Sequence, residues 1–204
     1  MGYYPIAMNL EGRKCLIVGG GSVAVRKAEA LAEAGAQVTV IAPEVDPRMH
    51  AVERVGLVER EFRSGDTSGY ALVFAATDDR PVNATVSQEA QANGIPVNVV
   101  DDPELCSFIV PSVLRRGDLL IAVSTSGKSP ALSKKLRRKL EDLFGPEYGT
   151  LTDLLGELRD QVKSRYDCQA DRDAAFHRLA DSDILDLLRE GRVEDARIRA
   201  LELL

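Results

Sequence analysis

Hydrophobic residues in the first half of the chain form short runs that alternate with segments of helical spacing. The apolar runs predict strands at residues 14–18, 37–41, 58–62, 71–75 and 96–100. Helical patterns lie between them at residues 23–34, 47–55 and 81–93, and Gly35 is placed to end the first helix in a left-handed conformation. Strands that alternate with helices build a mostly parallel sheet covered on both faces, so the pattern predicts an α/β fold.

The pattern changes after residue 100. Two further short strands are expected at residues 107–110 and 119–123, followed by a helix that Ser129 caps and Pro130 opens. From Gly149 onward, apolar residues recur at helical spacing. About 55 residues are too few for a comfortable independent core, so we expect these helices to pack on the rest of the chain or on a second chain.

The most specific local pattern is a strand that runs into G-x-G-x-x-A and then into a helix. In the loop Gly19–Gly20–Gly21, Gly19 permits a tight turn and Gly21 lets the backbone approach a pyrophosphate. Ala24 lets the helix lie close to the strand, and the helix N-terminus favours phosphate. The pattern predicts a dinucleotide site, and a purely structural glycine turn is the alternative.

An acidic residue follows at the spacing that nucleotide sites use. Glu44 comes 20 residues after Ala24, just beyond the second predicted strand, where a carboxylate can bond a ribose hydroxyl. A carboxylate there repels a 2′-phosphate, which favours NAD over NADP. Arg48 lies close enough in the sequence to keep NADP open.

Polar residues also end the fourth and fifth predicted strands. In an open parallel sheet ligands bind beyond the carboxyl ends of the strands, so Thr77 and Asp101 are expected to face the cofactor crevice. The alternative is structural, because Asp-Asp-Pro is a common turn and Asp78 and Asp79 can cap the helix that follows.

The sign of the charge reverses locally in a chain whose net charge is -6. Between residues 112 and 140, Asp118 is the single acid, and the basic residues are Arg115, Arg116, Lys128, Lys134, Lys135, Arg137, Arg138 and Lys139. Such a cluster favours a polyanionic ligand or an acidic partner, with a solvated helix face as the alternative. The hydroxyl-rich loop at residues 124–129 leads into a helix N-terminus, and the candidate ligands of an anionic substrate are Ser124, Thr125, Lys128 and Arg116.

Composition excludes several classes of protein. The 204 residues are 45% hydrophobic and 28% charged, as in a soluble globular protein, and the net acidity argues against a nucleic-acid partner. The three cysteines are far apart and there are two histidines, so neither a disulfide framework nor a resident metal is expected. We expect Cys15 to be a buried apolar residue and Cys106 to lie near the site. The apolar runs are too short to span a membrane, and the first residues lack a secretory signal, so a cytoplasmic location is expected.

Five motifs together resemble the precorrin-2 dehydrogenase family, which includes stand-alone enzymes and the N-terminal module of sirohaem synthases. They are Leu-Ile-Val-Gly-Gly-Gly-Ser-Val-Ala at residues 16–24, Ala-Ala-Thr-Asp-Asp at 75–79, Asn-Val-Val-Asp at 98–101, Ser-Phe-Ile-Val-Pro-Ser at 107–112 and Ala-Val-Ser-Thr-Ser-Gly-Lys-Ser-Pro at 122–130. The resemblance covers nearly the whole chain. No one motif is decisive, but their joint order and spacing are highly specific.

The resemblance implies NAD-dependent oxidation of precorrin-2 to sirohydrochlorin and, in some members, insertion of Fe²⁺ as a second substrate. It implies a Rossmann domain at residues 1–112, a central dimerisation region at 113–147 and a C-terminal helical domain at 148–204, in a homodimer with its active site at the dimer cleft. Asp101 matches the general base of relatives, and the matches to NAD-contacting positions are Ser22, Val23, Pro43 and Glu44. The substrate carries eight carboxylates, which gives the basic segment a chemical purpose.

The chain departs from some relatives where they have a Ser-Ser-Gly-Gly loop and it reads Ser-Thr-Ser-Gly at residues 124–127, although Thr125 keeps a hydroxyl. The sequence ends at Leu204 without the methyltransferase domain of the fused enzymes, so we expect another protein to methylate uroporphyrinogen. Two other functions stay open: an NAD-binding sensor without turnover, and a dehydrogenase of a small hydroxy or keto acid, which lacks a histidine in a catalytic context.

Overall fold

The computed structural model describes residues 2–204, so residue 1 of the expected 1–112 domain lies outside the described residues. The chain divides into two compact units, one ending at Val110 and the other spanning Pro111–Leu204. Each unit has its own sheet or hairpin and its own buried side chains.

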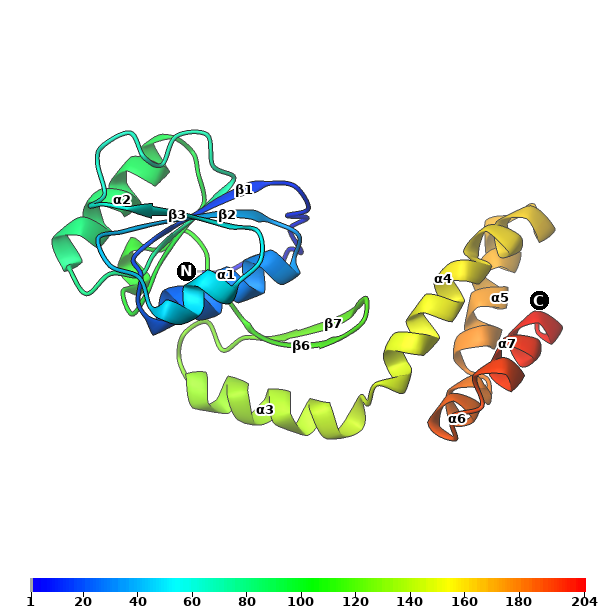
Figure 1. Cartoon of the computed structure of the whole chain (residues 1–204). Coiled ribbons are helices and arrows are strands. Elements are labelled where there is room, and N and C mark those ends of the chain that lie inside the picture. Colours follow the sequence, from blue (N-terminus) through cyan, green and yellow to red (C-terminus); the bar gives the residue numbers. More distant parts are fainter. Residues whose placement is uncertain (1) are drawn as a thin grey trace. The chain divides into compact units, whose positions relative to one another are not determined.

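The first unit is built on a five-stranded parallel sheet (Figure 1). Its strands are β1 (Lys14–Val18), β2 (Gln37–Ala42), β3 (Val55–Glu59), β4 (Leu72–Ala75) and β5 (Val97–Val99), in the order β3-β2-β1-β4-β5. The connecting helices are α1 (Ser22–Glu33) and α2 (Arg80–Ala92). The predicted α/β fold is confirmed, and the change of direction in strand order beside β1 is where such sheets bind ligands.

Two apolar clusters cover the two faces of this sheet. One joins α1 to the inward side chains of β1, β2 and β4, including Ile17, Val40 and Phe74. The other places Val86 and Ala90 of α2 against residues of β1, β4 and β5. Because both faces are covered, β1, β2 and β4 read as nearly continuous apolar runs, which is why the sequence predicted these three strands well.

Three predicted elements differ from the structure. The third strand lies three residues earlier than expected, and the expected helix at residues 47–55 is only the five-residue 3₁₀ helix η1 (Pro47–Ala51), because β3 already begins at Val55. Residues 107–110 are not a strand: Asn98 Nδ2 donates to the Phe108 carbonyl at 3.1 Å, so a side chain ties this segment to β5. The segment follows the short 3₁₀ helix η2 (Pro103–Leu105).

The second unit begins with an antiparallel hairpin, and the helix α3 packs against it. The hairpin pairs β6 (Ser112–Arg116) with β7 (Leu119–Val123), and α3 (Pro130–Leu143) contacts both strands. Ser129 caps α3 by accepting the Leu132 N–H at 3.3 Å, which confirms the predicted helix start. The strand β6 was missed because its alternating pattern is short and half polar.

The remaining helices bury a core of their own. They are α4 (Glu147–Arg165), α5 (Gln169–Ala180), α6 (Ile184–Arg189) and α7 (Val193–Glu202). Leu158, Val162, Leu179 and Ile184 are among the buried residues that they share. This differs from the expectation that the tail needs another surface for its core, because four short helices converge on one another. No helix in residues 2–204 has the length and apolar character to cross a bilayer.

Candidate cofactor and active site

The glycine loop after β1 is shaped by backbone contacts on two sides. Gly19 has a φ of +120°, and its N–H donates to the Ile41 carbonyl at 2.9 Å. A methyl group on Gly19 would lie 2.3 Å from the Ala76 carbonyl oxygen, so only glycine fits there. The loop therefore connects the ends of β1, β2 and β4 at one edge of the sheet.

The next two glycines have opposite surroundings. A methyl group on Gly20 would lie 2.0 Å from the Glu44 carbonyl oxygen, and the Gly20 carbonyl accepts the Asp46 N–H at 2.8 Å. A methyl group on Gly21 would meet no heavy atom within 4 Å. The space beside Gly21 fits a close-approaching diphosphate, as the sequence pattern predicts.

The N-terminus of α1 adds the donors that an anion needs. Gly21 is the N-cap and supplies no side-chain cap, and the first turn of the helix contains no acidic residue. The first helical bond runs from Val25 to the Gly21 carbonyl at 3.1 Å, which leaves the earlier amides, those of Ser22 and Val23 among them, available. Ser22 is exposed and Val23 is half-buried. These residues fit the phosphates of a dinucleotide.

The end of β2 lies against the glycine loop. Pro43 and Glu44 follow β2 directly and are exposed. Arg48 was the residue that left NADP as an alternative cofactor in the sequence analysis. It donates to Asp46 from Nε at 3.0 Å and from Nη2 at 2.7 Å. The hydrogen bonds from Arg48 lower the pKa of Asp46 to about 2. This paired guanidinium is a poorer ligand for a 2′-phosphate than a free one, and the exposed Glu44 carboxylate suits a ribose hydroxyl.

Thr77, at the end of β4, is engaged by its own domain. Its hydroxyl donates to Asn83 Oδ1 at 2.7 Å, and Asn83 Nδ2 donates to the Thr77 carbonyl at 2.9 Å. Asp79 caps α2 by accepting the Val82 N–H at 3.1 Å. Asn83 was missed in the sequence because nothing local marks a buried helical amide as the partner of a loop. It holds the Thr77 turn against the glycine loop, so closely that a methyl group on Gly19 would lie 3.0 Å from the Thr77 nitrogen.

Asp101 follows β5 at the same edge of the sheet. The Val100 N–H donates to the Ala75 carbonyl at 2.9 Å, which ties this turn to the end of β4. Asp101 is exposed and has a φ of +59°, a conformation that L-residues rarely adopt. Its neighbour Asp102 is paired with Arg80 at 3.0 Å. Asp101 therefore lies in a turn, as the structural alternative predicts. It is also exposed at the edge of the sheet where ligands bind, so both interpretations are compatible with the structure.

The cysteines differ in environment. Cys15 is fully buried in β1, and burial raises the pKa of its thiol to about 11, as expected of an apolar core residue. Cys106 is half-buried, and its Sγ accepts the Val99 N–H at 3.1 Å. Its single proton is shared between the Val99 carbonyl at 3.2 Å and the Asp102 carbonyl at 3.3 Å. Burial also raises the pKa of the Cys106 thiol. This thiol therefore braces the turn that carries Asp101 and is not activated as a nucleophile.

In the second unit, the hydroxyl-rich loop is ordered by its own side chains. The Thr125 hydroxyl accepts the Ser129 N–H at 3.0 Å and lies 3.2 Å from the Ser133 hydroxyl. Ser124 Oγ accepts the Ser126 N–H at 3.0 Å. Lys128 is exposed. Ser124, Thr125 and Lys128 are thus gathered in one loop before α3.

Arg116 lies apart from that loop. It pairs with Leu119 at the closed end of the hairpin, whereas Ser124 follows the opposite end of β7. Its Nε donates to the Phe144 carbonyl at 2.9 Å, so its guanidinium caps the C-terminus of α3. The structure therefore does not bring Arg116 together with Lys128, and the remaining basic side chains of α3 are mostly exposed.

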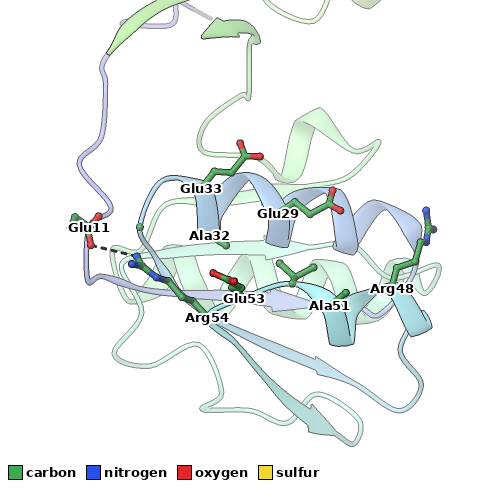
Figure 2. Close-up of a pocket in the computed structure, with 10 residues that line it drawn as sticks. Glu11, Glu29, Ala32, Glu33, Arg48, Ala51, Glu53 and Arg54 are labelled. Atoms are coloured by element: carbon green, nitrogen blue, oxygen red, sulfur yellow. Dashed lines mark hydrogen bonds and ion pairs between the residues drawn. The ribbon is translucent and has the colours of Figure 1, made fainter. Parts of the chain in front are cut away.

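A hollow of about 720 Å³ lies on the flank of the first unit, between α1 and residues 48–54 (Figure 2). Four carboxylates line it against two guanidinium groups, and Glu11 pairs with Arg54 at 3.5 Å; the charged lining residues are Glu11, Glu29, Glu33, Glu53, Arg48 and Arg54. It borders the second half of α1, away from the glycine loop. An acidic lining repels phosphate, so this hollow does not suit the dinucleotide.

Three family models match successive parts of the chain. The model described as "Putative NAD(P)-binding" matches residues 6–112. "Sirohaem biosynthesis protein central" matches residues 116–143, and "Sirohaem synthase dimerisation region" matches residues 147–204.

Curated relatives match almost the full length of the chain. Siroheme synthase of Pseudomonas paraeruginosa is 43% identical over 205 residues, which cover 99% of this chain and 44% of that protein. Siroheme synthase of Methylobacillus flagellatus is 44% identical over 196 residues, covering 95% of this chain and 42% of that protein. The chain thus spans less than half the length of these relatives.

A solved structure has a similar fold. The protein described as SirC, precorrin-2 dehydrogenase, superposes with a TM-score of 0.76 at 24% identity, over 98% of this chain and 100% of that one. At this identity the likeness establishes the fold.

Proposed function

The chain belongs to the NAD(P)-binding family whose model matches residues 6–112, and from this premise we propose that it is an NAD-dependent precorrin-2 dehydrogenase. The reaction oxidises precorrin-2 to sirohydrochlorin in sirohaem biosynthesis. The two sirohaem family models and the siroheme synthase relatives support this substrate. We also propose a cytoplasmic location, consistent with the three free cysteines among the described residues.

One observation carries the proposal. The ends of four adjacent strands present Glu44, the Gly19–Gly21 loop, Thr77 and Asp101 along one edge of the sheet, in the order of the strands. Gly21 would hold the diphosphate of a dinucleotide and Glu44 its adenosine ribose. The β4 and β5 side of the edge, where Asp101 lies, would remain for the nicotinamide.

The chemistry needs a hydride acceptor and a proton acceptor. Bound NAD supplies the hydride acceptor. The Asp101 carboxylate is exposed at the same edge, so in this proposal it accepts the proton that leaves the tetrapyrrole. Asp102 and Cys106 hold the Asp101 turn in place, which keeps the carboxylate at that edge.

The polycarboxylate substrate needs cations and hydroxyls. We propose that Ser124, Thr125 and Lys128 bind its carboxylates, because they are gathered in one loop. Arg116 is included as a substrate ligand through the guanidinium N–H groups other than Nε, which donates to the Phe144 carbonyl.

The proposal includes the functional division into residues 1–112, 113–147 and 148–204, and the ranges of the family models support it. It also includes a homodimer, supported by the dimerisation-region match at residues 147–204. Fe²⁺ is proposed as a second substrate, because metal insertion also requires a base that removes pyrrole protons, and Asp101 can serve both steps.

The test mixes the protein anaerobically with enzymatically generated precorrin-2 and NAD. We expect NADH and sirohydrochlorin to rise together, and faster sirohaem formation than in the protein-free control once Fe²⁺ is added. Asp101→Asn should lower kcat at least about 100-fold without changing NAD affinity. Glu104→Gln, an exposed acid in η2, is the matched control and should be fully active. NAD binding without any turnover by the wild type would instead support the sensor function.

A further inference from the structure

Lys27 is a half-buried cation at the inner side of α1. Its Nζ lies 5.2 Å from the centroid of the Phe74 ring in β4. Phe74 is buried and makes an edge-to-face contact with Phe108, with ring centroids 5.6 Å apart. The ammonium is therefore held at an aromatic surface between α1 and the segment that follows η2.

The ammonium has no carboxylate partner in the structure. None of the ion pairs within residues 2–204 includes Lys27. Burial lowers the pKa of Lys27, the charge of Arg26 lowers it further, and the Cys106 thiol opposes them. The other half-buried cation among residues 2–110, Arg60, is paired with Asp66 at 2.6 Å. Packing alone does not explain Lys27, because an apolar side chain would cover Phe74 without the desolvation cost.

The position of Lys27 relates it to the Asp101 turn. Helical side chains lean towards the N-terminus of their helix, and the N-terminus of α1 lies at the carboxyl edge of the sheet. Phe74, which lies under the ammonium, pairs with Asn98 of β5, and Asn98 Nδ2 donates to the Phe108 carbonyl at 3.1 Å. The ammonium thus lies over the part of the sheet where β5 leads into the Asp101 turn.

We propose that the Lys27 ammonium binds a carboxylate of the polycarboxylate tetrapyrrole beside Asp101 and thereby positions the substrate for proton removal. This inference rests on the proposed function and deepens it, because it assigns a substrate contact in the first unit. A carboxylate would supply the counter-ion that the half-buried ammonium lacks. The diphosphate of the cofactor is the other anion at this edge, so the experiment distinguishes the two.

The test measures two equilibria and one rate for Lys27→Met, Lys27→Arg and a control. Uroporphyrin, a stable octacarboxylate tetrapyrrole, is titrated by fluorescence, NAD is titrated by calorimetry, and KM and kcat are measured with precorrin-2. Lys14→Met is the control, since it removes an exposed lysine at the start of β1, the opposite edge of the sheet.

We expect Lys27→Met to weaken uroporphyrin binding and to raise the KM for precorrin-2 roughly tenfold or more, with NAD affinity unchanged. Lys27→Arg should restore most of the affinity, and Lys14→Met should behave as the wild type. Weaker NAD binding with unchanged uroporphyrin binding would overturn the proposal, and so would an unchanged KM. If Lys27→Met does not fold, Lys27→Gln carries the same comparison.

Failure of this inference is separable from failure of the proposed function. A wild-type protein that binds uroporphyrin through Lys27 but forms no NADH would retain this contact and overturn the dehydrogenase. A protein that oxidises precorrin-2 equally well with Met at residue 27 would retain the dehydrogenase and overturn this contact.

Discussion

At the scale of single residues, Gly20 and Gly21 are neighbours in one turn, yet a side chain would meet a different environment at each. A methyl group at Gly20 has the Glu44 carbonyl oxygen 2.0 Å away, whereas at Gly21 nothing lies within 4 Å. Backbone cannot move aside as a flexible side chain can, so the fold itself excludes a methyl group at Gly20. At Gly21 only a ligand would exclude it.

Gly20→Ala and Gly21→Ala therefore separate folding from cofactor binding. We expect Gly20→Ala to lower the free energy of unfolding by several kcal/mol, in the range of severe overpacking. Gly21→Ala should cost at most about 1 kcal/mol, as a poorer N-cap, while NAD affinity falls at least about tenfold. Urea denaturation and calorimetric titration with NAD measure the two effects. Equal NAD affinity in Gly21→Ala and the wild type would contradict the cofactor site.

Asp101 holds a left-handed backbone conformation with a φ of +59°. Glycine adopts this conformation freely and a β-branched residue resists it. We expect Asp101→Gly to stabilise the protein by about 0.5 kcal/mol and Asp101→Val to destabilise it by about 1–2 kcal/mol. Both should abolish precorrin-2 oxidation. Thermal unfolding alongside the anaerobic assay tests this, and an Asp101→Gly protein with the activity of the wild type would show that the carboxylate is dispensable.

At the scale of elements, α2 anchors the loop between β3 and β4 through one carboxylate. Glu89 accepts the Gly65 N–H at 2.9 Å and the Thr67 N–H at 3.0 Å, and Thr67 is fully buried. Burial raises the pKa of Glu89, but the hydrogen bonds from Thr67, Gly65 and Ser64 outweigh it, so the pKa lies below its ordinary value. The ionised form is thus the one that the folded state favours.

The pH dependence of stability follows from that direction. A carboxyl whose pKa is lowered by folding stabilises the protein above its ordinary pKa, and this stabilisation is lost as the pH falls through the folded-state value. We expect Glu89→Gln to cost about 1–2 kcal/mol at pH 7 and progressively less as the pH falls below about 4.5. Urea denaturation of both proteins from pH 7 to pH 3 measures the difference, with Glu104→Gln as the control. A constant difference across this range would contradict the anchoring role.

At the scale of the whole molecule, α3 presents apolar side chains to solvent in a basic helix. Leu132, Leu136 and Leu143 are 46%, 39% and 64% exposed, and Val113 and Leu120 of the hairpin are also exposed. Apolar side chains gathered on an exposed surface agree with the proposed homodimer.

Leu132→Asp/Leu136→Asp should therefore convert the proposed dimer into a monomer with an unchanged helical spectrum. Light scattering after size-exclusion chromatography measures the mass, and Lys135→Ala, an exposed neighbour on α3, should leave the dimer intact. A wild type that is monomeric at micromolar concentration, or a dimeric double variant, would contradict this use of α3.

Local signals in the sequence determined much of this protein. The strands β1, β2 and β4, the helices α1 and α2, and the Ser129 cap of α3 all follow from periodicity and capping within a few neighbouring residues. The glycine loop and Glu44 were placed by spacing, because the turn between a strand and a helix leaves little freedom. The motifs carried the resemblance to the precorrin-2 dehydrogenase family. The chain belongs to the NAD(P)-binding family, and it is similar to siroheme synthases and to two sirohaem family models along the rest of its length.

The tertiary structure decided what depends on residues far apart in the chain. The register of β3 depends on its pairing with β2, and the form of residues 107–110 depends on the Asn98 side chain. Arg116, a candidate substrate ligand by charge, instead caps α3 at Phe144, 28 residues away. Lys27 became a candidate ligand only because the fold places its ammonium over Phe74 of another element. Spacing and propensity depend on residues that are neighbours in the sequence. These contacts join residues far apart in the sequence and form only when the chain packs, so no local pattern predicts them.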